Sequence, residues 1–448
     1  MGLRIGSSKV SAIVNDTSRP RGKYLVRFVD YDGTILKQAY LNKGQKIKVP
    51  ANPTHDGLTF SQWVSPVTIT SGELVTPDSD VTVGASYTTV SEQSEFYVSL
   101  NSATGLAVTL NMNGTKDWGD GTTNTDTSHT YTSAGDYVIK CNGTTMTTSS
   151  SAGLFGQTSS TKNCSVTKVH LKGTTGVGAY AFINCRSLEA VNLQIQNGAI
   201  ATYAFYSCTS LKSLTLKGAT SLGDLALGLC TALKAAILPT TITTIGAQVF
   251  RYCYTLLSIT LPEGVTSVGA NCFRDDNALL FINIPSTLTA LSDGFVRGCS
   301  GLELVSVAGA TSFTSNAFYG CKNLAEFVMN GSVTALGSNL FYNCPSLKSL
   351  EITGNVTSVD SRAFYYACAL ESVKLPGTIT SIAAEAFSCA FGVQEYDFTD
   401  FTAIPTLANV SAFSEMNQLC VIKVPASLEA SWKAASNWLT YANQIVGV

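Results

Sequence analysis

A motif of the form Ala-Phe-x-x-Cys-x-x-Leu recurs along more than half of this chain of 448 residues. Successive motifs begin 23, 22, 23, 23, 23, 22, 23, 23, 23 and 26 residues apart. A fixed period of this length predicts a solenoid, in which each repeat forms one coil that packs only against its neighbours. The aromatic position of the motif is occupied by Phe182, Phe205, Leu227, Phe250, Phe273, Val296, Phe318, Phe341, Phe364, Phe387 and Phe413.

Each repeat also contains a short strand pattern, Leu-x-x-Leu-x-Leu, as in residues 211–216 and 347–352. A Leu-Pro turn and the pattern Ile-Thr-x-Ile-Gly often follow, as in residues 238–246. A single coil cannot bury both apolar segments, so the coils are expected to stack with these side chains inside. Each buried Phe would then contribute roughly 1.5–3 kcal/mol.

The repeated motif resembles the BspA-type bacterial leucine-rich repeat, and the resemblance covers residues 160–425. It implies an adhesion or recognition role, since such solenoids are typically surface adhesins. Several positions depart from the pattern. Asp276 replaces the motif Cys, an extra residue is expected to displace Cys299, and Cys368 and Cys389 are out of register. We expect local bulges or bends in those coils.

Residues 23–90 have the alternating pattern of β-strands, with an Asp32-Gly33 pair that is typical of a hairpin turn. Together with Pro50-x-x-Pro53 and the later Phe60-x-x-Trp63, this segment resembles the internalin-type B repeat, a β-grasp-like module. The resemblance implies a chiefly structural role, such as that of a spacer.

Residues 91–150 contain Asp-Trp-Gly-Asp-Gly-Thr at 117–122 and His-Thr-Tyr at 129–131. These segments resemble the PKD-type Ig-like sandwich, although Trp118 lies closer to the Gly-Asp-Gly turn than that family places it. A compact variant of the sandwich is expected.

The chain is therefore predicted to be mainly β, with short helical or 3-10 turns in the solenoid. After the last coil, Ser427 could serve as the N-cap of a helix that carries Leu428, Trp432 and Leu439. Such a helix would close the solenoid. The expected parts are an N-terminal arm (1–22), a β-grasp-like module (23–90), an Ig-like β-sandwich (91–150), the solenoid (151–425) and a C-terminal helical cap (426–448).

Charge and hydropathy exclude two classes of partner. Only 13% of residues are charged, and 28 basic against 30 acidic residues leave a net charge of −2, so no broad basic face is expected to bind nucleic acid. No apolar run reaches the roughly 18 residues that cross a bilayer. The first 22 residues also lack the apolar stretch of a secretory signal.

The cysteines occupy repeat positions and not the spacings of metal sites. Cys185, Cys208, Cys230, Cys253, Cys321 and Cys344 share one column, with an expected spacing of about 4.8 Å. We interpret them as a reduced, buried ladder. The chain has no Cys-x-x-Cys pair and only three His residues, so no metal or other cofactor is predicted.

Asp117, Asp120 and His129 could be read as a hydrolytic or calcium site, but the resemblance implies a turn and a core strand instead. His55 lies in a predicted loop and His170 on a predicted strand. No nucleophile or phosphate-binding motif is present, so no catalytic residue is assigned and the chain is not expected to be an enzyme.

The first candidate binding surface is the column one residue past the motif Phe. Tyr and Arg are enriched at binding hot spots, and Tyr also suits the faces of sugars. Stacked at coil spacing, three Arg and three Tyr would form a ladder about 25 Å long. The alternative is that they only cover an edge of the solenoid. The candidate residues are Tyr206, Arg251, Arg274, Arg297, Tyr319, Tyr342 and Tyr365.

The second candidate surface is apolar and lies on the strands, where other coils have Ser, Thr, Lys or Glu. Contiguous exposed apolar surface usually marks an interface, here for a ligand or for self-association of the solenoid. A flanking module lying over this face is the alternative. The candidate residues are Ile237, Leu257, Leu280, Phe281, Leu304 and Val328.

These patterns indicate a non-catalytic recognition protein that binds a bacterial or host cell-surface protein or glycan. The first expectation is a bacteriophage tail or virion component, attached to a larger assembly through residues 1–22. The alternatives are a secreted or cell-wall adhesin of a bacterium and a self-assembling structural protein, including a homo-oligomer.

Counting free thiols tests the reduced ladder. In denaturant we expect all 13 cysteines to react with a thiol reagent, because none is expected to form a disulfide. Recovery of only a few thiols would contradict the ladder and favour disulfides. The same count without denaturant provides the control, since buried thiols should react slowly.

Overall fold

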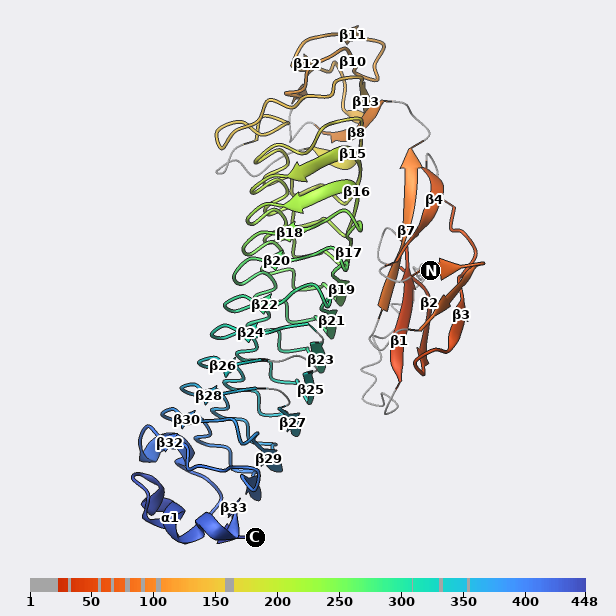
Figure 1. The fold of residues 1–448 in the computed structure, drawn as a ribbon. Coiled ribbons are helices and arrows are strands. Elements are labelled where there is room, and N and C mark those ends of the chain that lie inside the picture. The colour runs from red at the N-terminus through yellow and green to blue at the C-terminus, as the bar shows by residue number, and fades with distance from the viewer. Residues whose placement is uncertain are drawn as a thin grey trace, which may run out of the picture.

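The computed structural model describes most of the chain, and its elongated shape is shown in Figure 1. The predicted arm at 1–22, the Asp32-Gly33 turn, His55 and Cys164 lie outside the described residues. The described ranges are 23–30, 34–54, 58–65, 68–76, 81–89, 93–101, 106–157, 165–307, 309–329, 333–352 and 355–448.

The first part is a small module of two sheets, here called the N-terminal module (residues 23–89). Its four-stranded sheet has the order β2-β1-β7-β4, with β1 antiparallel to β2 and parallel to β7. Val26, Phe28 and Leu74 lie in its core. The strands are β1 (Tyr24–Val29), β2 (Ile35–Leu41), β4 (Leu58–Val64) and β7 (Val81–Thr89), with β3 (Lys46–Lys48), β5 (Ile69–Thr70) and β6 (Glu73–Val75) in the second sheet.

Residues 93–157 are joined to the solenoid and form its N-terminal end. Strand β8 pairs on one side with β13 and on the other with β14, the first solenoid strand. The apolar core runs without a break from Phe96 and Trp118 to Ile445. This region therefore caps the first coil and shares its core with the solenoid. Its strands are β8 (Ser94–Leu100), β9 (Ala107–Thr109), β10 (Lys116–Asp117), β11 (Thr123–Asn124), β12 (Ser128–Thr130) and β13 (Gly135–Cys141).

The solenoid confirms the predicted fold class of stacked β-coils. It begins with β14 (Val166–Lys172), β15 (Ala190–Ile200) and β16 (Ser213–Leu222), after which each coil carries two short strands in parallel pairing. One row consists of β17 (Ala235–Ile237), β19 (Ser258–Thr260), β21 (Phe281–Asn283), β23 (Leu304–Val307), β25 (Glu326–Met329), β27 (Ser349–Glu351), β29 (Ser372–Lys374), β31 (Glu395–Asp397) and β33 (Val421–Val424). The outward side of this row is called the strand face.

The second row of strands precedes the turns that carry the Phe motif, here called the turn edge. It consists of β18 (Thr244–Ile245), β20 (Ser267–Val268), β22 (Ala290–Leu291), β24 (Ser312–Phe313), β26 (Ala335–Leu336), β28 (Ser358–Val359), β30 (Ser381–Ile382) and β32 (Thr406–Leu407). In Figure 1 the turns project as a row of loops on the side away from the N-terminal module.

The motif Phe residues form buried stacks, as the repeat predicts, and the buried Leu227 and Val296 occupy the motif position in the two coils between them. Phe341 is fully buried, and its ring lies 5.3 Å from that of Phe318 and 5.5 Å from that of Phe364, with interplanar angles of 10° and 17°. Phe327 contacts Phe341 edge-on at 4.8 Å. Each ring therefore covers the apolar face of the next coil.

Two residues in nearly every coil adopt left-handed backbone, two places before and two places after the motif position. Asn339 and Asn343 have φ values of 55° and 57° around Phe341. Asn tolerates this conformation, which most other residues adopt only at a cost of about 1–2 kcal/mol. The turns then bond to the next coil, as where the N–H of Asn343 donates to the Tyr365 carbonyl at 2.8 Å.

The cysteine column is confirmed as a buried ladder. All cysteines among the described residues are free. From Cys208 onward, the column thiols donate to a carbonyl of the preceding coil, as Cys208 does to Phe182 at 3.1 Å and Cys344 to Phe318 at 3.2 Å. Burial raises the pKa of Cys344 to about 12, so little reactive thiolate forms.

Cys299 belongs to this ladder, so its expected displacement is wrong. Its thiol donates to Phe273 at 2.9 Å, because Cys299 follows Val296 by the usual three residues. Cys368 and Cys389 are out of register as predicted, and Ala367 and Ala390 fill the column instead. The expected bend is absent there, since Phe364 and Phe387 still stack at 5.0 Å.

The C-terminal end is closed by short helices and a final strand. These are η1 (Val410–Phe413), η2 (Ala426–Leu428), α1 (Glu429–Ala434), η3 (Trp438–Tyr441) and β34 (Ile445–Gly447), which pairs with β33. Trp432 and Trp438 are buried over the last coil, and the Trp438 indole donates to the Pro405 carbonyl at 2.9 Å.

Two details predicted for this cap are wrong. Ser427 lies inside η2 and does not cap α1, because a 3-10 turn precedes the helix. Leu439 is 66% exposed, since Trp438 takes the buried position. In the described part of the chain, none of the helices is long and apolar enough to span a membrane.

Removing one ring tests the stacked core. We expect Phe341→Ala to lower the free energy of unfolding by about 3–5 kcal/mol, through lost apolar burial and the cavity left behind. Urea unfolding followed by circular dichroism measures this loss. The neighbouring Tyr342→Ala is the control and should cost less, because Tyr342 is partly exposed. An unchanged unfolding curve for Phe341→Ala would show that the column is not the core.

Asp276 provides a pH test of the cysteine column. It is fully buried at the Cys position, and burial raises its pKa well above the usual range, although Oδ1 accepts the Cys253 N–H at 2.7 Å. The protonated folded form is stable at low pH. As pH rises above the unfolded pKa of about 3.9, stability should fall by about 1.4 kcal/mol per pH unit until the raised folded pKa is reached.

The variant Asp276→Cys removes this ionisation. We expect it to be more stable than the unchanged chain at pH 7 and to lose most of that advantage at pH 4, measured by urea unfolding at both pH values. Asp400→Asn is the control, because Asp400 lies at the surface in an ion pair with Lys374 and far from Asp276 along the solenoid. An advantage of Asp276→Cys that is equal at both pH values would contradict a buried neutral carboxyl.

Candidate functional site

The tyrosines of the predicted column form a stack along the turn edge. The rings of Tyr319 and Tyr342 lie 4.7 Å apart at an angle of 2°, and those of Tyr342 and Tyr365 lie 4.8 Å apart at 6°. All three side chains are partly exposed. The coil repeat alone sets this spacing, because the same column position recurs at each coil. The structure therefore brings these three predicted residues together.

Of the three predicted arginines, one joins the stack. The guanidinium of Arg297 lies 4.7 Å from the ring centre of Tyr319, in a cation–π contact. Arg251 instead turns to its own coil and lies 4.4 Å from the Tyr252 ring, while Arg274 pairs with Asp275 at 3.1 Å. The expected six-residue ladder is thus shortened, because short-range partners hold Arg251 and Arg274.

Tyr206 lies in a different cluster near the start of the solenoid. Its ring contacts Tyr203 edge-on at 5.1 Å, and Tyr203 stacks on Tyr180 at 5.2 Å and 7°. The coils of Gly228, Arg251 and Arg274 separate this cluster from the other tyrosines. Tyr206 is therefore not part of the same surface as Tyr319.

Two exposed aromatic residues that the column analysis missed extend the stack. Tyr366 lies 5.4 Å from Tyr365, and Phe391 lies 6.2 Å from Tyr366; they are 43% and 47% exposed. Tyr366 occupies the left-handed turn position two places past Phe364, with φ 63°, as Tyr252 does two places past Phe250. Inspecting this second column for aromatic residues was the available sequence signal. The aromatic row is defined as Arg297, Tyr319, Tyr342, Tyr365, Tyr366 and Phe391.

Stacking determines which chemical groups of the aromatic row are available to a ligand. The faces of Tyr342 are covered by Tyr319 and Tyr365, and Arg297 covers one face of Tyr319. A flat platform for sugar faces, which the composition suggested, is therefore not available along the stack. Ring edges and hydroxyls remain. Ring edges carry partial positive charge and favour oxygen acceptors, and hydroxyls both donate and accept. The neighbouring Cys389 and, to a smaller extent, burial raise the pKa of Tyr365.

The apolar strand-face candidates are divided by the N-terminal module. Ile237 and Phe281 are 9% and 7% exposed, and Val328 is 42% exposed. Leu257, Leu280 and Leu304 are partly buried. Figure 1 shows the module beside the strands of the solenoid. The alternative of a flanking module over this face therefore holds for Ile237 and Phe281, and Val328 stays exposed.

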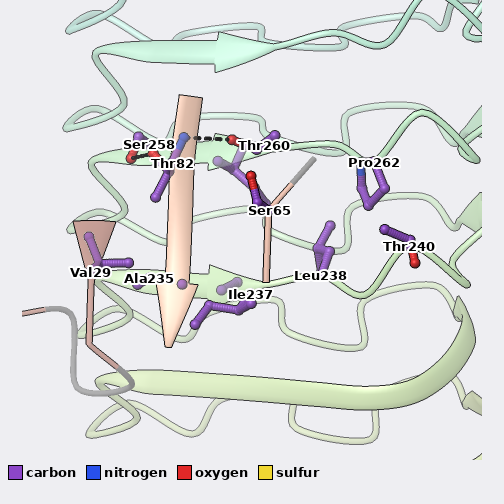
Figure 2. A pocket seen from close by; sticks show the side chains of 13 residues that line it. Val29, Ser65, Thr82, Ala235, Ile237, Leu238, Thr240, Ser258, Thr260 and Pro262 are labelled. Atoms are coloured by element: carbon purple, nitrogen blue, oxygen red, sulfur yellow. Dashed lines mark hydrogen bonds between the residues drawn. The ribbon is translucent and has the colours of Figure 1, made fainter. Parts of the chain in front are cut away.

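A few contacts hold the N-terminal module against the strand face. Figure 2 shows Thr82 of β7 between Ser258 and Thr260 of β19: its N–H donates to Thr260 Oγ1 at 3.2 Å, and its hydroxyl lies 3.1 Å from that of Ser258. Arg27 lies over the ring of Phe281 at 5.3 Å. Gly84 abuts Ile237, and a Cβ added at Gly84 would lie only 2.2 Å from Ile237 Cδ1. A larger residue at position 84 would force Ile237 or the module to move.

The later coils of the strand face carry charges instead. Lys374 lies 3.0 Å from Asp400 and 3.7 Å from Asp397, and Lys423 lies 2.8 Å from Glu395. These pairs bridge neighbouring coils at the surface. Exposed pairs of this kind stabilise little, but they keep this half of the face polar.

Asp117, Asp120 and His129 build a turn, as the sequence analysis expected. The Gly119 N–H donates to Asp117 and the Thr122 N–H to Asp120, both at 3.0 Å. His129 Nε2 lies 2.7 Å from Asp120 Oδ2, and this contact lowers the Asp120 pKa. The His129 ring stacks on the buried Trp118 at 5.1 Å. Within the described ranges, no group of three or more His, Cys, Asp or Glu side chains could hold a metal ion.

Solved structures of several leucine-rich-repeat proteins are similar to this chain. A leucine-rich repeat protein from Bacteroides ovatus shares 18% identity, with a TM-score of 0.34, over 63% of this chain and 94% of that chain. A leucine rich cell surface protein from Faecalibacterium prausnitzii shares 24% identity, with a TM-score of 0.38, over 61% and 74%. The leucine-rich repeat protein of T. pallidum shares 29%, with a TM-score of 0.31, over 34% and 72%. No curated protein matches the chain.

The sequence model for the BspA type Leucine rich repeat region matches residues 175–303 and 302–420 in six copies, more than half of the chain. This match covers the coils whose Phe and Cys columns form the core. The chain therefore belongs to the BspA-type leucine-rich-repeat family.

Proposed function

We propose that this chain is a non-catalytic recognition protein that binds a cell-surface protein or glycan through the aromatic row. The observation that carries the proposal is the stack of Tyr319, Tyr342 and Tyr365 at a spacing of 4.7–4.8 Å, partly exposed and flanked by Arg297. Tyr and Arg dominate binding hot spots because they combine a large area with hydrogen bonding.

The rigidity of the row supports binding. The rings restrain one another, and the Phe stack holds the backbone beneath them, so little side-chain entropy is lost when a ligand binds. The hydroxyls and ring edges of these partly exposed tyrosines favour a ligand rich in oxygen acceptors, such as a peptide backbone or a glycan. The Arg297 guanidinium adds a donor for anionic groups at one end.

The proposed setting is the virion surface of a bacteriophage tail, where the row would bind a component of the bacterial host surface. The alternative is a bacterial adhesin, secreted or attached to the cell wall, that binds a host protein or glycan. The low share of charged residues, 13%, supports both settings. Neighbouring tail or baseplate genes would favour the first, and sortase or secretion genes the second.

Self-assembly through the strand face receives less support. The N-terminal module covers Ile237 and Phe281, which were two of the candidate interface residues. Attachment of residues 1–22 to a larger assembly stays a prediction, because they lie outside the described residues.

Removing the stacked rings tests the aromatic row. We expect the triple variant Tyr319→Ala, Tyr342→Ala, Tyr365→Ala to bind at least about tenfold more weakly in a glycan-array or whole-cell pull-down assay, because hot-spot aromatics often contribute more than 1–2 kcal/mol each. The matched control is Tyr180→Ala with Tyr203→Ala, an equally stacked pair on other coils of the solenoid. Binding of the triple variant at the level of the unchanged chain would show that the aromatic row is not the binding surface.

A second triple variant, with Phe at the same three positions, separates the roles of ring and hydroxyl. It keeps the stack and removes the hydroxyls. Binding as weak as that of the Ala variant would assign recognition to the hydroxyls, whereas full binding would assign it to the ring edges.

A further inference from the structure

A cavity of about 160 Å³ lies where the N-terminal module meets the solenoid. Both sides contribute to its wall: β4 supplies Gln62 and Trp63, while the solenoid supplies Thr215 and Lys217 of β16, followed by Ile237 and Thr240. A smaller space of about 30 Å³, shown in Figure 2, shares Ile237 and Thr240 with it. The contact region between the N-terminal module and the solenoid, here called the seam, therefore contains open space and is not tightly packed.

One wall of the cavity holds a buried polar group without a partner. Trp63 Nε1 is inaccessible to solvent and has no hydrogen-bond acceptor. The indole is held in place by edge-on contact with Phe28 at 5.5 Å and by Phe60 at 5.4 Å. Nε1 therefore does not open to the cavity, and the indole contributes fixed aromatic surface to the cavity wall.

The charge of the cavity is positive. Lys217 is exposed and has no ion-pair partner among the described residues, and no Asp or Glu is among the described residues that line the cavity. Thr215 and Thr240 add hydroxyls, and Gln62 adds an amide. The donors thus outnumber fixed negative charges, so the lining favours an anion that carries several oxygen acceptors.

The size of the cavity restricts the ligand further. A cavity of about 150 Å³ accommodates one six-membered ring such as benzene. Benzene-like ligands need a dry apolar wall, whereas this wall combines Ile237 with hydroxyl, amide and ammonium groups. A single polar ring with an acidic substituent meets both requirements.

We propose that the seam is a binding site for one acidic monosaccharide unit of a glycan, such as a uronic acid. Lys217 contacts the carboxylate, Gln62 and the Thr hydroxyls contact ring oxygens, and Trp63 and Ile237 pack against the apolar ring face. This site lies on the strand face and does not depend on the aromatic row. It extends the proposed recognition role to a second surface.

The site is composite, because neither side encloses the cavity alone. The module stays seated through Thr82 and through the close approach of Gly84 to Ile237. A larger side chain at Gly84 would meet Ile237 and lift the module. Separation of the two parts should therefore abolish binding without changing a residue that lines the 160 Å³ cavity.

The experiment titrates the full chain with methyl β-D-glucuronide and follows binding by saturation-transfer NMR. Neutral methyl β-D-glucoside is the reference ligand. We expect the glucuronide to bind and the glucoside to bind at least about tenfold more weakly, because charge-assisted hydrogen bonds to Lys217 are lost. Equal binding of the two, or no binding of the glucuronide, of a galacturonide and of a sialoside, would overturn the proposal.

Two single variants locate the site. Lys217→Gln should weaken glucuronide binding about tenfold. The matched control is Lys234→Gln, an exposed lysine of a neighbouring coil that does not line the cavity and should bind unchanged. Equal effects of the two lysine variants would assign binding to general surface charge and overturn the proposal.

The composite nature of the site is tested by opening and by locking the seam. Gly84→Leu should abolish glucuronide binding and enlarge the radius of gyration in X-ray scattering. Thr82→Cys with Ser258→Cys should form a disulfide, because the two hydroxyls lie 3.1 Å apart, and should preserve binding. The native buried thiols should not interfere, since burial raises their pKa values.

Two further results test whether the site needs both sides of the seam and whether it is independent of the aromatic row. Unchanged binding by Gly84→Leu, with the radius of gyration enlarged, would overturn a site that needs both sides of the seam. The triple Tyr variant of the aromatic row should bind glucuronide normally. Failure of the aromatic-row test would then leave the seam proposal intact, and failure of the seam test would leave the aromatic row intact.

Discussion

Contact between neighbouring coils, ring on ring along the Phe column, is the interaction on which the rest of this structure depends. Every coil offers one apolar face to the coil before it and one to the coil after it, as Phe341 does to Phe318 and Phe364. Such a core grows in one dimension and has no interior end. The two terminal coils therefore need covering, and side chains that point outward remain free of the core.

The two ends are covered by different means. At the start, β8 adds to the solenoid sheet through β14 and places Phe96 and Trp118 in the same core. At the end, two buried Trp residues and the final strand close the last coil. The module of residues 23–89 covers neither end. It lies along the strand face, where it covers apolar side chains that the coils cannot bury themselves.

The same repeat creates two surfaces with different chemistry. On the turn edge, one column position recurs at each coil, so identical residues stack and present only their edges, as in Tyr319, Tyr342 and Tyr365. On the strand face, the early coils are apolar beneath the module, and the later coils carry ion pairs such as Lys423 with Glu395. Recognition through two separate surfaces is compatible with one rigid core.

The sequence by itself determined the period, the buried Phe and Cys columns and the alignment of Tyr319, Tyr342 and Tyr365, because each follows from local spacing. Only the tertiary structure decided that Arg251 and Arg274 bond within their own coils, that Tyr366 and Phe391 extend the row, and that a module far earlier in the chain covers Ile237. These depend on rotamers and on docking between distant segments. Neither is encoded in a periodic pattern, since many arrangements share the same spacing.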